Sequence, residues 1–353
     1  MKIKSFKIGK VNFSNSKCVI IAEAGVNHNG SLKIAEKLIK SAKKAGADII
    51  KFQTYKAEKL TIKKSPRFWN WSGEVKKNGS QYESYKRLDI FNKKEYLKLS
   101  NLCKKYKIEF LSTPFDEESV DMLYKIGVKG FKVASCDITN FPLLKKIASK
   151  RLPVLLSTGA SNISEVKKAV NYLNNNGSNK ICIMHCTLCY PTKPSDANLS
   201  AVTHLNKVFK NYLIGLSDHT LGINVASSSV LLGVRAIEKH FTIDKNLKKS
   251  ADHWLSIDPK QLNNLRKNVD EVIKSYGGLG KKVLESEKKT RLLARRSVVT
   301  KFDIKKGEKI SNKNITTKRP GNGMKPEYYF KILGKRAKRN LNKDFQISFK
   351  DVL

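Results

Sequence analysis

The sequence predicts a (β/α)8 barrel of the TIM type, followed by a small β-rich domain at the C-terminus. Eight short apolar runs recur along the first three-quarters of the chain, and polar or charged residues gather near their C-terminal ends. Long segments, several of them strongly helical, separate the runs, and short β-like pieces follow after about Arg296. The runs are CVIIAEAG at 18–25, ADIIKFQT at 47–54, EFLSTP at 109–114, GFKVAS at 130–135, PVLLSTG at 153–159, ICIMHCT at 181–187, LIGLSDH at 213–219 and AIEKHFT at 236–242.

Each of these runs has the composition of a strand that is buried on both faces, as the strands of parallel sheets are. Parallel neighbours need a crossover of about a dozen residues or more. The gaps allow this, and the segment SLKIAEKLIKSAKKAG at 31–46 has the pattern of such a helix. Because catalytic groups of (β/α)8 barrels collect at the C-terminal ends of the strands, the active site is expected there.

Three segments organise the chain. A catalytic barrel is predicted over 1–280, a charged linker over 281–295, and the β-rich domain over 296–353. A domain this small has a marginal core, so it is expected to pack against the barrel or against another subunit. Within the barrel, the aromatic and glycine-containing connection at 55–90 is interpreted as an ordered excursion over the barrel mouth.

The formal net charge of +40 raises the possibility of a nucleic-acid partner. However, the lysines are spread over almost every predicted helix, and neither a helix-turn-helix nor a zinc finger accompanies them. A solvated, lysine-rich surface that attracts anionic substrates is the preferred interpretation, so no nucleic-acid partner is expected. The six scattered cysteines and the lack of a signal peptide or membrane-length apolar run predict a cytoplasmic protein without a membrane partner.

Two histidines close the last two strands of the predicted barrel. His219 ends the seventh run and His240 lies near the end of the eighth, so two inward imidazoles on adjacent strands can share one metal ion. Glu238, two residues before His240, faces the same way and is a candidate for a further ligand or for orienting one. Imidazole with oxygen ligands suits Mn²⁺, Co²⁺, Fe²⁺ or Zn²⁺. The alternative is a pair of hydrogen-bonded core histidines.

Charged and hydroxyl side chains are predicted to meet at the same barrel mouth. Glu23 on the first strand should lie beside Lys51 and Gln53 of the second, and Lys132 lies on the fourth. A lysine in a barrel mouth is costly unless it meets a carboxylate, a phosphate or a substrate, although a purely structural ion pair with Glu23 is an alternative. The hydroxyls at the strand ends are Thr113, Ser135, Ser157 and Ser217. Together these groups describe a pocket for a phosphate and a carboxylate.

A rival interpretation comes from three cysteines. Cys182, Cys186 and Cys189 have the C-x3-C-x2-C spacing of radical S-adenosylmethionine enzymes, whose cluster leaves one iron open. Here the motif lies on the sixth strand rather than after the first, and a strand spreads its residues over a greater length than a cluster-binding loop. Buried strand cysteines are the preferred explanation.

Seven strings in order resemble the sialic acid synthase family, which includes the N-acetylneuraminate, legionaminate and pseudaminate synthases. The resemblance continues through KRPGNG at 318–323 into a tail that looks like the family's antifreeze-like (SAF) domain. In that family the domain is donated across a homodimer. The strings are EAGVNHNG at 23–30, IKFQT at 50–54, STPFD at 112–116, LSTGA at 156–160, HCTLCYPT at 185–192, GLSDHT at 215–220 and EKHFT at 238–242.

The resemblance implies that phosphoenolpyruvate condenses with an N-acylated mannosamine-type sugar to a nine-carbon 2-keto acid and phosphate. N-acetylmannosamine, as in N-acetylneuraminate synthase, and a 2,4-diacetamido-trideoxy relative are the implied acceptors. A divalent metal, Mn²⁺ with Mg²⁺ or Co²⁺ as alternatives, would be bound by His219 and His240. The implied catalytic residues are Glu23, Lys51 and Lys132. The implied substrate-binding residues are Gln53, Thr113, Ser135, Asp137, Ser157, Tyr190, Ser217, Asp252 and, from the tail, Arg319.

Two departures from the family pattern predict a variant sugar site. Leu188 stands where the family commonly has a polar residue, and Asp137 carries its carboxylate on a shorter arm than the usual glutamate. The segment ADHWLSIDP at 251–259 keeps Asp252 but adds a bulky histidine and tryptophan. A synthase of another keto sugar acid, such as the octulosonate branch, is the alternative, and the resemblance of the C-terminal domain argues against it.

Overall fold

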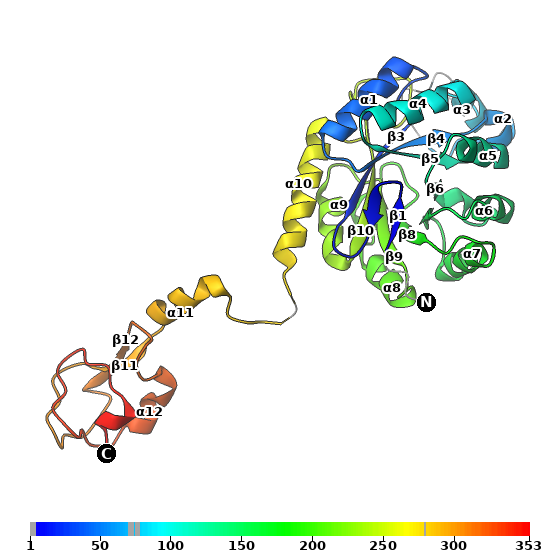
Figure 1. Cartoon of the computed structure of the whole chain (residues 1–353). Helices are drawn as coiled ribbons and strands as arrows, with labels where there is room; N and C mark the ends of the chain where they lie inside the picture. The colour runs from blue at the N-terminus through cyan, green and yellow to red at the C-terminus, as the bar shows by residue number, and fades with distance from the viewer. Residues whose placement is uncertain (1–4, 70–73, 75–77, 279) are drawn as a thin grey trace. The chain divides into compact units, whose positions relative to one another are not determined.

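The computed structural model describes residues 5–69, 74, 78–278 and 280–353. The chain forms two compact units, Met1–Gly277 and Gly278–Leu353, which are described separately here (Figure 1). The connection predicted over the barrel mouth lies partly outside the described residues. No helix of the described residues is long and apolar enough to cross a membrane.

The first unit is a nearly closed barrel of parallel strands, so the predicted fold class is confirmed. The strands are hydrogen-bonded in the order β5-β4-β3-β10-β9-β8-β7-β6, which leaves β5 and β6 at the two ends. All the predicted runs became strands, although β10 begins two residues before its run. The strands are β3 (Val19–Gly25), β4 (Ile49–Thr54), β5 (Glu109–Pro114), β6 (Phe131–Val133), β7 (Val154–Ser157), β8 (Ile181–Cys186), β9 (Leu213–Asp218) and β10 (Val234–His240).

Helices alternate with the strands and surround them (Figure 1). In α1, the side chain of Ser31 caps the first turn by accepting a hydrogen bond from the backbone N–H of Ile34, and the apolar face of the helix is buried. The α-helices of this unit are α1 (Leu32–Lys44), α2 (Ala57–Leu60), α3 (Gln81–Lys86), α4 (Lys93–Lys105), α5 (Glu117–Lys125), α6 (Phe141–Ala148), α7 (Ile163–Asn175), α8 (Ser200–Val208), α9 (Asn224–Ser229) and α10 (Pro259–Tyr276). Its 3₁₀ helices are η1 (Ser135–Asp137), η2 (Pro194–Asp196) and η3 (Val230–Leu232).

The barrel interior is apolar at the N-terminal ends of its strands. There, an antiparallel hairpin of β1 (Phe6–Ile8) and β2 (Val11–Phe13), which the sequence analysis did not predict, packs its apolar side chains against those of the strands. The rings of Phe6 and Phe13 stack with their centroids 5.0 Å apart. The hairpin therefore closes this end of the barrel with apolar contacts.

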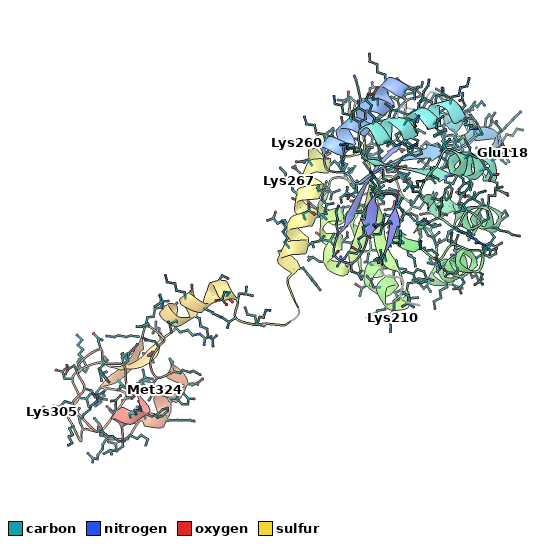
Figure 2. All side chains as sticks on the ribbon, viewed as in Figure 1. Glu118, Lys210, Lys260, Lys267, Lys305 and Met324 are labelled. Atoms are coloured by element: carbon teal, nitrogen blue, oxygen red, sulfur yellow. The ribbon has the colours of Figure 1, made fainter. Side chains whose placement is uncertain are left out.

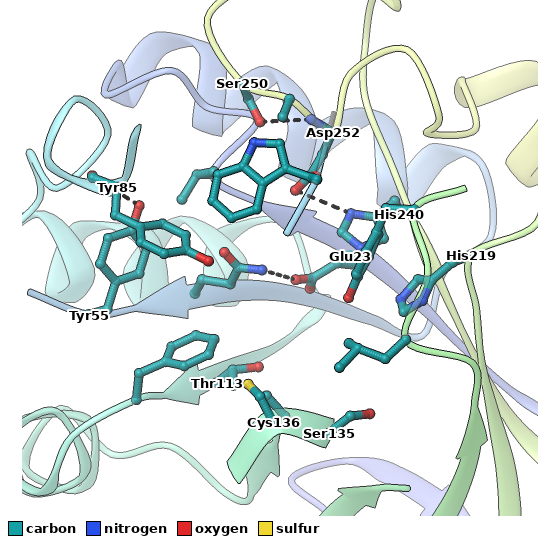
Figure 3. A pocket seen from close by; sticks show the side chains of 18 of the residues that line it. Glu23, Tyr55, Tyr85, Thr113, Ser135, Cys136, His219, His240, Ser250 and Asp252 are labelled. Atoms are coloured by element: carbon teal, nitrogen blue, oxygen red, sulfur yellow. Dashed lines mark hydrogen bonds and ion pairs between the residues drawn. The ribbon is translucent and has the colours of Figure 1, made fainter. Parts of the chain in front are cut away.

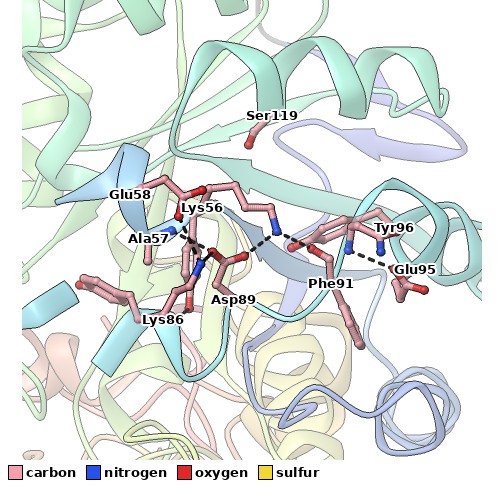
Figure 4. Close-up of polar contacts among 12 residues, drawn as sticks. Lys56, Ala57, Glu58, Lys86, Asp89, Phe91, Glu95, Tyr96 and Ser119 are labelled. Carbon is pink, nitrogen blue, oxygen red and sulfur yellow. Dashed lines mark hydrogen bonds and ion pairs between the residues drawn. The ribbon is translucent and has the colours of Figure 1, made fainter. Parts of the chain in front are cut away.

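The carboxylate of Asp89 fastens the long connection between β4 and α4 (Figure 4). It accepts hydrogen bonds from the Lys56 ammonium at 2.6 Å and from the backbone N–H of Ala57 at 3.0 Å. Lys86 of α3 lies 3.8 Å from the same carboxylate, and Lys56 also donates to the carbonyl of Phe91 at 3.2 Å. These bonds hold the start of α2 and the segment after α3 together beside the C-terminal end of β4.

The second unit has a small core of its own, made by side chains that include Val298, Ile315 and Met324. Its antiparallel strands are β11 (Ser297–Thr300) and β12 (Ile315–Lys318), and its helices are α11 (Lys288–Ala294), α12 (Tyr329–Ile332), η4 (Glu285–Glu287), η5 (Pro326–Tyr328) and η6 (Phe349–Asp351). The last β-like piece of the sequence forms two isolated bridges, Gln346 to Val299 and Val352 to Ala337, with η6 between them, rather than a strand. The segment predicted as linker contains η4 and α11.

Exposed lysines extend from many different elements of both units (Figure 2). Examples labelled in the figure are Lys210, Lys260, Lys267 and Lys305, all of them exposed. Their dispersion fits a solvated surface, because a nucleic-acid footprint requires a concentrated basic stripe.

Candidate active site

A cavity of about 550 Å³ opens among the C-terminal ends of the barrel strands (Figure 3). All the site residues predicted in the barrel line it, and so does Leu188. Arg319, the remaining predicted residue, belongs to the second unit and is exposed. The predicted residues lining the cavity are Glu23, Gln53, Lys51, Thr113, Lys132, Ser135, Asp137, Ser157, Tyr190, Ser217, His219, His240 and Asp252.

The twofold alternation of a strand explains this convergence. Along β3, Val19 and Ile21 face the apolar lower interior, and Glu23, two residues further, faces the cavity. Along β4, Ile49 faces the lower interior, and Lys51 lines the cavity in the same way. The strands thus deliver polar side chains from distant parts of the sequence to one level of the barrel.

Two ammonium groups and two carboxylates form a buried network at the cavity floor. Lys51 Nζ lies 2.8 Å from Glu23 Oε2 and 3.7 Å from Glu238 Oε1. Lys132 Nζ lies 3.1 Å from Glu238 Oε1, to which the Ser217 hydroxyl also donates at 3.1 Å. Glu238 is therefore the centre of the network, a role the sequence analysis did not assign to it.

The two carboxyl groups of this network have very different pKa values. Burial raises the pKa of Glu23 to about 7, against the opposing effect of the Lys51 charge. Burial also acts to raise the pKa of Glu238, but the charges of Lys132 and Lys51 outweigh it and lower that pKa to about 2. Such a split suits Glu23 to proton transfer near neutral pH and keeps Glu238 ionised.

Several buried polar atoms at the cavity have no hydrogen-bond partner among the described residues. They include Ser157 Oγ, Glu238 Oε2 and His240 Nδ1. Buried polar groups in folded proteins are nearly always hydrogen-bonded, so these atoms indicate a polar ligand in the cavity.

The geometry of the two histidines fits a divalent metal ion. Their ring centroids are 5.4 Å apart. His219 Nδ1 lies 2.9 Å from the carbonyl oxygen of Thr187, which can only accept a hydrogen bond, so the remaining nitrogen, Nε2, is the one that can bind a ligand. Burial acts to lower the pKa of His219, but the neighbouring Cys186 and the bond to Thr187 outweigh it and raise that pKa, so a metal ion would have to displace the Nε2 proton. Burial and the charges of His219 and Lys51 lower the pKa of His240 well below its usual value, which favours the neutral, metal-binding form.

The described residues contain no group of three or more His, Cys, Asp or Glu side chains placed to hold a metal ion. An ion held by His219 and His240 would therefore keep open positions for water or substrate. Glu238 is engaged by lysines and is not a third ligand in this arrangement.

The same finding argues against the iron–sulfur alternative, since all three of its cysteines are described. Cys182 lies in the apolar lower interior of the barrel, whereas Cys186 lines the cavity and Cys189 is exposed. The cysteines of β8 thus lie at different levels of the barrel, as buried strand residues do.

An apolar wall lines the outer part of the cavity. Val26, Tyr55 and Leu88 form a small cluster against which Tyr85 and Phe115 pack. The sequence analysis predicted that the connection containing Tyr55, Tyr85 and Leu88 lies over the barrel mouth, but it named none of these residues as site residues, because scattered apolar side chains carry no periodic signal that places each of them at a site.

Comparisons with known proteins agree with this architecture. The NeuB family model matches residues 38–281, and the SAF domain model matches residues 295–353. The chain is 43% identical to an N,N'-diacetyllegionaminic acid synthase of Campylobacter jejuni, over 93% of this chain and 98% of that protein. It is 41% identical to a protein of the same name from Legionella pneumophila, over 93% of each chain.

A solved structure extends the likeness to the fold. The N-acetylneuraminic acid (sialic acid) synthetase of Leptospira borgpetersenii superposes with a TM-score of 0.72 at 35% identity, over 82% of this chain and 95% of that chain. The family match covers well over half of the chain, and the curated relatives span nearly all of it. This protein therefore belongs to the NeuB family of sialic-acid-type synthases and carries a SAF domain at its C-terminus.

Proposed function

We propose that this enzyme condenses phosphoenolpyruvate with an N-acylated mannosamine-type sugar to a nine-carbon 2-keto acid, with release of phosphate. The observation that carries this proposal is one cavity at the barrel mouth, in which two lysines, several hydroxyls and two carboxyl groups with different pKa values meet two histidines. The names of the similar synthases support the product class.

The phosphate and carboxylate of phosphoenolpyruvate would be held at the cavity floor. Lys51 and Lys132 supply positive charge, and Lys51 already donates a hydrogen bond to Thr113 at 2.9 Å. The unpartnered Ser157 hydroxyl is free to donate to a phosphate oxygen. Ser135 and Ser217 complete the set of hydroxyls predicted to contact this substrate. Because the cationic groups are buried and fixed by the carboxylates, they need little rearrangement when an anion enters.

Glu23 is the residue that we assign to proton transfer. Its carboxyl lies between Lys51 at 2.8 Å and the amide of Gln53, whose Nε2 is 3.4 Å from Oε1. With a pKa near neutrality, this group can take a proton from the water that adds at carbon 2 and later return it. Lys51 and Lys132 would stabilise the charge that develops on the phosphate as it leaves.

His219 and His240 would hold the divalent ion, for which we propose Mn²⁺, with Mg²⁺ or Co²⁺ as alternatives. When bound, the ion would supply a Lewis acid for the aldehyde oxygen of the open-chain sugar. Tyr190 packs against His219 with ring centroids 4.1 Å apart and ring planes tilted by 34°, which restrains that imidazole. Asp252 Oδ2 lies 3.6 Å from His240 Nδ1, on the sugar side of the site.

Among acceptors, we propose a 2,4-diacetamido-trideoxy sugar rather than a 6-phosphorylated one. The apolar wall of Tyr55, Tyr85 and Phe115 suits an acetamido methyl and a deoxy carbon. Arg87 is a further cation of the cavity lining. It already donates a hydrogen bond to the carbonyl of Lys249 at 3.0 Å, so we do not assign it to a sugar phosphate. The names of the relatives at 43% and 41% identity point to the same sugar class. N-acetylmannosamine is the second candidate, favoured by the name of the Leptospira structure.

We also propose a homodimer in which the SAF domain of one subunit completes the active site of the other. The exposed Arg319 would then contact the sugar, for which its fixed fork of donors is well suited. Arg319→Ala should raise the KM for the sugar and leave that for phosphoenolpyruvate unchanged. A monomer in analytical ultracentrifugation, with undiminished activity, would exclude this arrangement.

The test of the proposed function is phosphate release from phosphoenolpyruvate with Mn²⁺ and then with EDTA. Each acceptor is offered in turn: the 2,4-diacetamido-trideoxy sugars, N-acetylmannosamine and its 6-phosphate. We expect metal-dependent release with a trideoxy sugar and none with the 6-phosphate. Absence of phosphate release with every acceptor would contradict the proposed reaction. Full activity of His219→Ala with metal present would contradict the metal assignment.

A further inference from the structure

We propose that Lys239 and Asp218, a buried ion pair outside the cavity, are positioning residues that hold His219 and His240 at one level for a divalent ion. The inference rests on the proposed function, because it concerns the metal that the two histidines would bind. Each member of the pair immediately precedes one of these histidines in the sequence.

The pair lies on the helix-facing side of the sheet. Side chains alternate along a strand, so Lys239 points away from the cavity that Glu238 and His240 line. Ile237 and Leu216, two residues before Lys239 and Asp218, belong to the apolar layer between strands and helices. A lysine in this layer is unusual, since ionised groups are almost never fully buried unless they are paired.

The contacts within the pair are close and complete. Lys239 Nζ lies 2.8 Å from Asp218 Oδ2, and both side chains are 2% exposed. Lys239 also donates to the carbonyl oxygen of Thr220. Asp218 in turn accepts hydrogen bonds from the backbone N–H of Thr220 at 2.9 Å and from its hydroxyl at 3.2 Å. The two charges thus join β10 to the segment that follows β9.

An irregularity in the sheet explains why such a tie is needed. β10 pairs with β9 first at Val234↔Ile214 and next at Ile237↔Leu216, so three residues of one strand oppose two of the other. Beyond this bulge, the pairing must be re-established before the histidines are reached. A slip by one residue would turn every side chain to the opposite face. Lys239 and Asp218 are partners in the register directly before the histidines.

The stability of the fold alone does not account for an ion pair at this place. Apolar residues of similar volume often stabilise a protein as well as a buried ion pair or better. A charge pair, however, is satisfied in only one register, because any slip leaves both charges buried and alone. Specifying register is therefore the function that the geometry favours for this pair.

A chain of bonds leads from the pair to the imidazole of His219. Thr220 forms a bridge with Thr192, whose backbone N–H donates to the carbonyl of His219 at 3.0 Å. The hydroxyl of Thr192 lies 2.9 Å from the carbonyl oxygen of Cys189 and 3.3 Å from that of Thr187, so its proton is shared between the two. The carbonyl of Thr187 also accepts from His219 Nδ1 at 2.9 Å. Movement of Asp218 and Thr220 would thus shift the group that orients His219.

The decisive experiment measures binding of Mn²⁺ alone to the full chain, by titrating free Mn²⁺ with electron paramagnetic resonance. The double variant Lys239→Met with Asp218→Asn removes both charges while nearly conserving volume. We expect this variant to fold, as judged by circular dichroism, and to bind Mn²⁺ about 10-fold or more weakly than the wild type, as other changes behind metal ligands do. A folded double variant with wild-type affinity would overturn the inference.

A second variant decides the question if the double variant does not fold. Thr220→Val keeps both charges and removes only the hydroxyl that braces Asp218. It should weaken Mn²⁺ binding about threefold, corresponding to the net worth of about one hydrogen bond or less, and unchanged affinity would contradict the inference. Asp48→Asn is the matched control, because its carboxylate pairs with Lys17 at the N-terminal ends of the strands. The control should leave Mn²⁺ affinity unchanged.

The wild-type chain separates this inference from the proposed reaction. Metal-dependent phosphate release by the wild type, together with unchanged Mn²⁺ affinity in the variants, would contradict the positioning role and leave the proposed reaction standing. Mn²⁺ binding that weakens in the variants, with no phosphate release from phosphoenolpyruvate in the presence of any of the sugars, would support the positioning role and contradict the reaction. A wild-type chain that binds no Mn²⁺ would overturn the inference directly.

Discussion

The lower and upper halves of the barrel interior are built from the same strands and have opposite chemistry. In the lower half the inward side chains are apolar and pack against the β1–β2 hairpin. In the upper half, one or two inward positions later, they are charged or carry hydroxyls. The apolar members are Phe6, Ile8, Phe13, Val19, Ile21, Ile49, Leu111, Leu155, Cys182, Met184, Leu213 and Ala236.

This difference separates stability from activity along each strand. Apolar burial stabilises the fold by roughly 25 cal/mol for each Å² removed from water, so the lower half contributes directly to folding. The buried charges of the upper half contribute little, because the cost of taking them out of water offsets their attraction. Substitutions at the two levels should therefore have separable effects, and the following predictions test that separation.

The largest effect is expected at Lys132 in the upper half. Lys132→Met should lower kcat/KM for phosphoenolpyruvate about 1,000-fold, or about 4 kcal/mol, because a fixed cation next to the phosphate is lost. Steady-state phosphate release measures this change. Lys129→Met is the matched control at an exposed position nearby, and it should leave the kinetics unchanged. Equal kinetics in the two variants would remove Lys132 from the site.

A substitution in the lower half should affect folding instead. Leu155→Ala, at a position with 0% exposure, should reduce the free energy of unfolding by about 3 kcal/mol through lost burial and a cavity. Urea unfolding followed by circular dichroism measures this loss. The kcat/KM of the folded fraction should match that of the wild type. A large loss of activity in the folded variant would show that the two halves are coupled.

Acid sensitivity should come in part from His28, which is buried and stacks on Phe91 with ring centroids 4.2 Å apart. Burial lowers its pKa to about 3 from 6.5, and the nearby charges of Lys249 and His253 act in the same direction. Below pH 6.5 the His28 imidazole becomes protonated in the unfolded chain but stays neutral in the folded chain. Stability should therefore fall by about 1.4 kcal/mol for each pH unit between about 6.5 and 3 on account of this group.

Urea unfolding of His28→Asn between pH 6.5 and 4.5 measures that contribution. In the variant, the free energy of unfolding should fall less steeply with decreasing pH than in the wild type. The two slopes should differ by nearly the contribution of one proton, about 1.4 kcal/mol for each pH unit, even if the variant is less stable at neutral pH. His204→Asn, at an exposed position, is the control for the substitution itself. Identical slopes for His28→Asn and the wild type would contradict a buried neutral histidine.

The smallest effect is expected at Ser157, two residues from Leu155 on the same face of β7. Its hydroxyl has no partner among the described residues, so Ser157→Ala should leave the free energy of unfolding nearly unchanged. The KM for phosphoenolpyruvate should rise about tenfold, or about 1.4 kcal/mol, for one lost hydrogen bond to a charged ligand. A stability loss comparable to that of Leu155→Ala would contradict the division between the two halves.

The sequence by itself determined the strands and the level at which each polar side chain lies. Apolar runs of strand length separated by long gaps predict parallel strands, and the twofold alternation along a strand sends Glu23, Lys51 and His240 to one face. These are local properties of the chain, and they need no knowledge of neighbours. For the same reason, the strand residues predicted to face inward line the cavity. Asp137, Tyr190 and Asp252, which lie outside the strands and were implied by the family resemblance alone, line it as well.

The sequence offered Glu23 as a partner of Lys51, but the tertiary structure alone decided the other charge partners at the site. Glu238 stands at the centre of the network because its strand closes the barrel beside β3, whereas the sequence offered it as a further metal ligand or as a residue that orients one. The pairing of Lys239 with Asp218 depends on the register after a bulge, and the β1–β2 hairpin is two strands of three residues each. Such features arise from contacts between residues far apart in the chain, and periodicity along the chain carries no information about them.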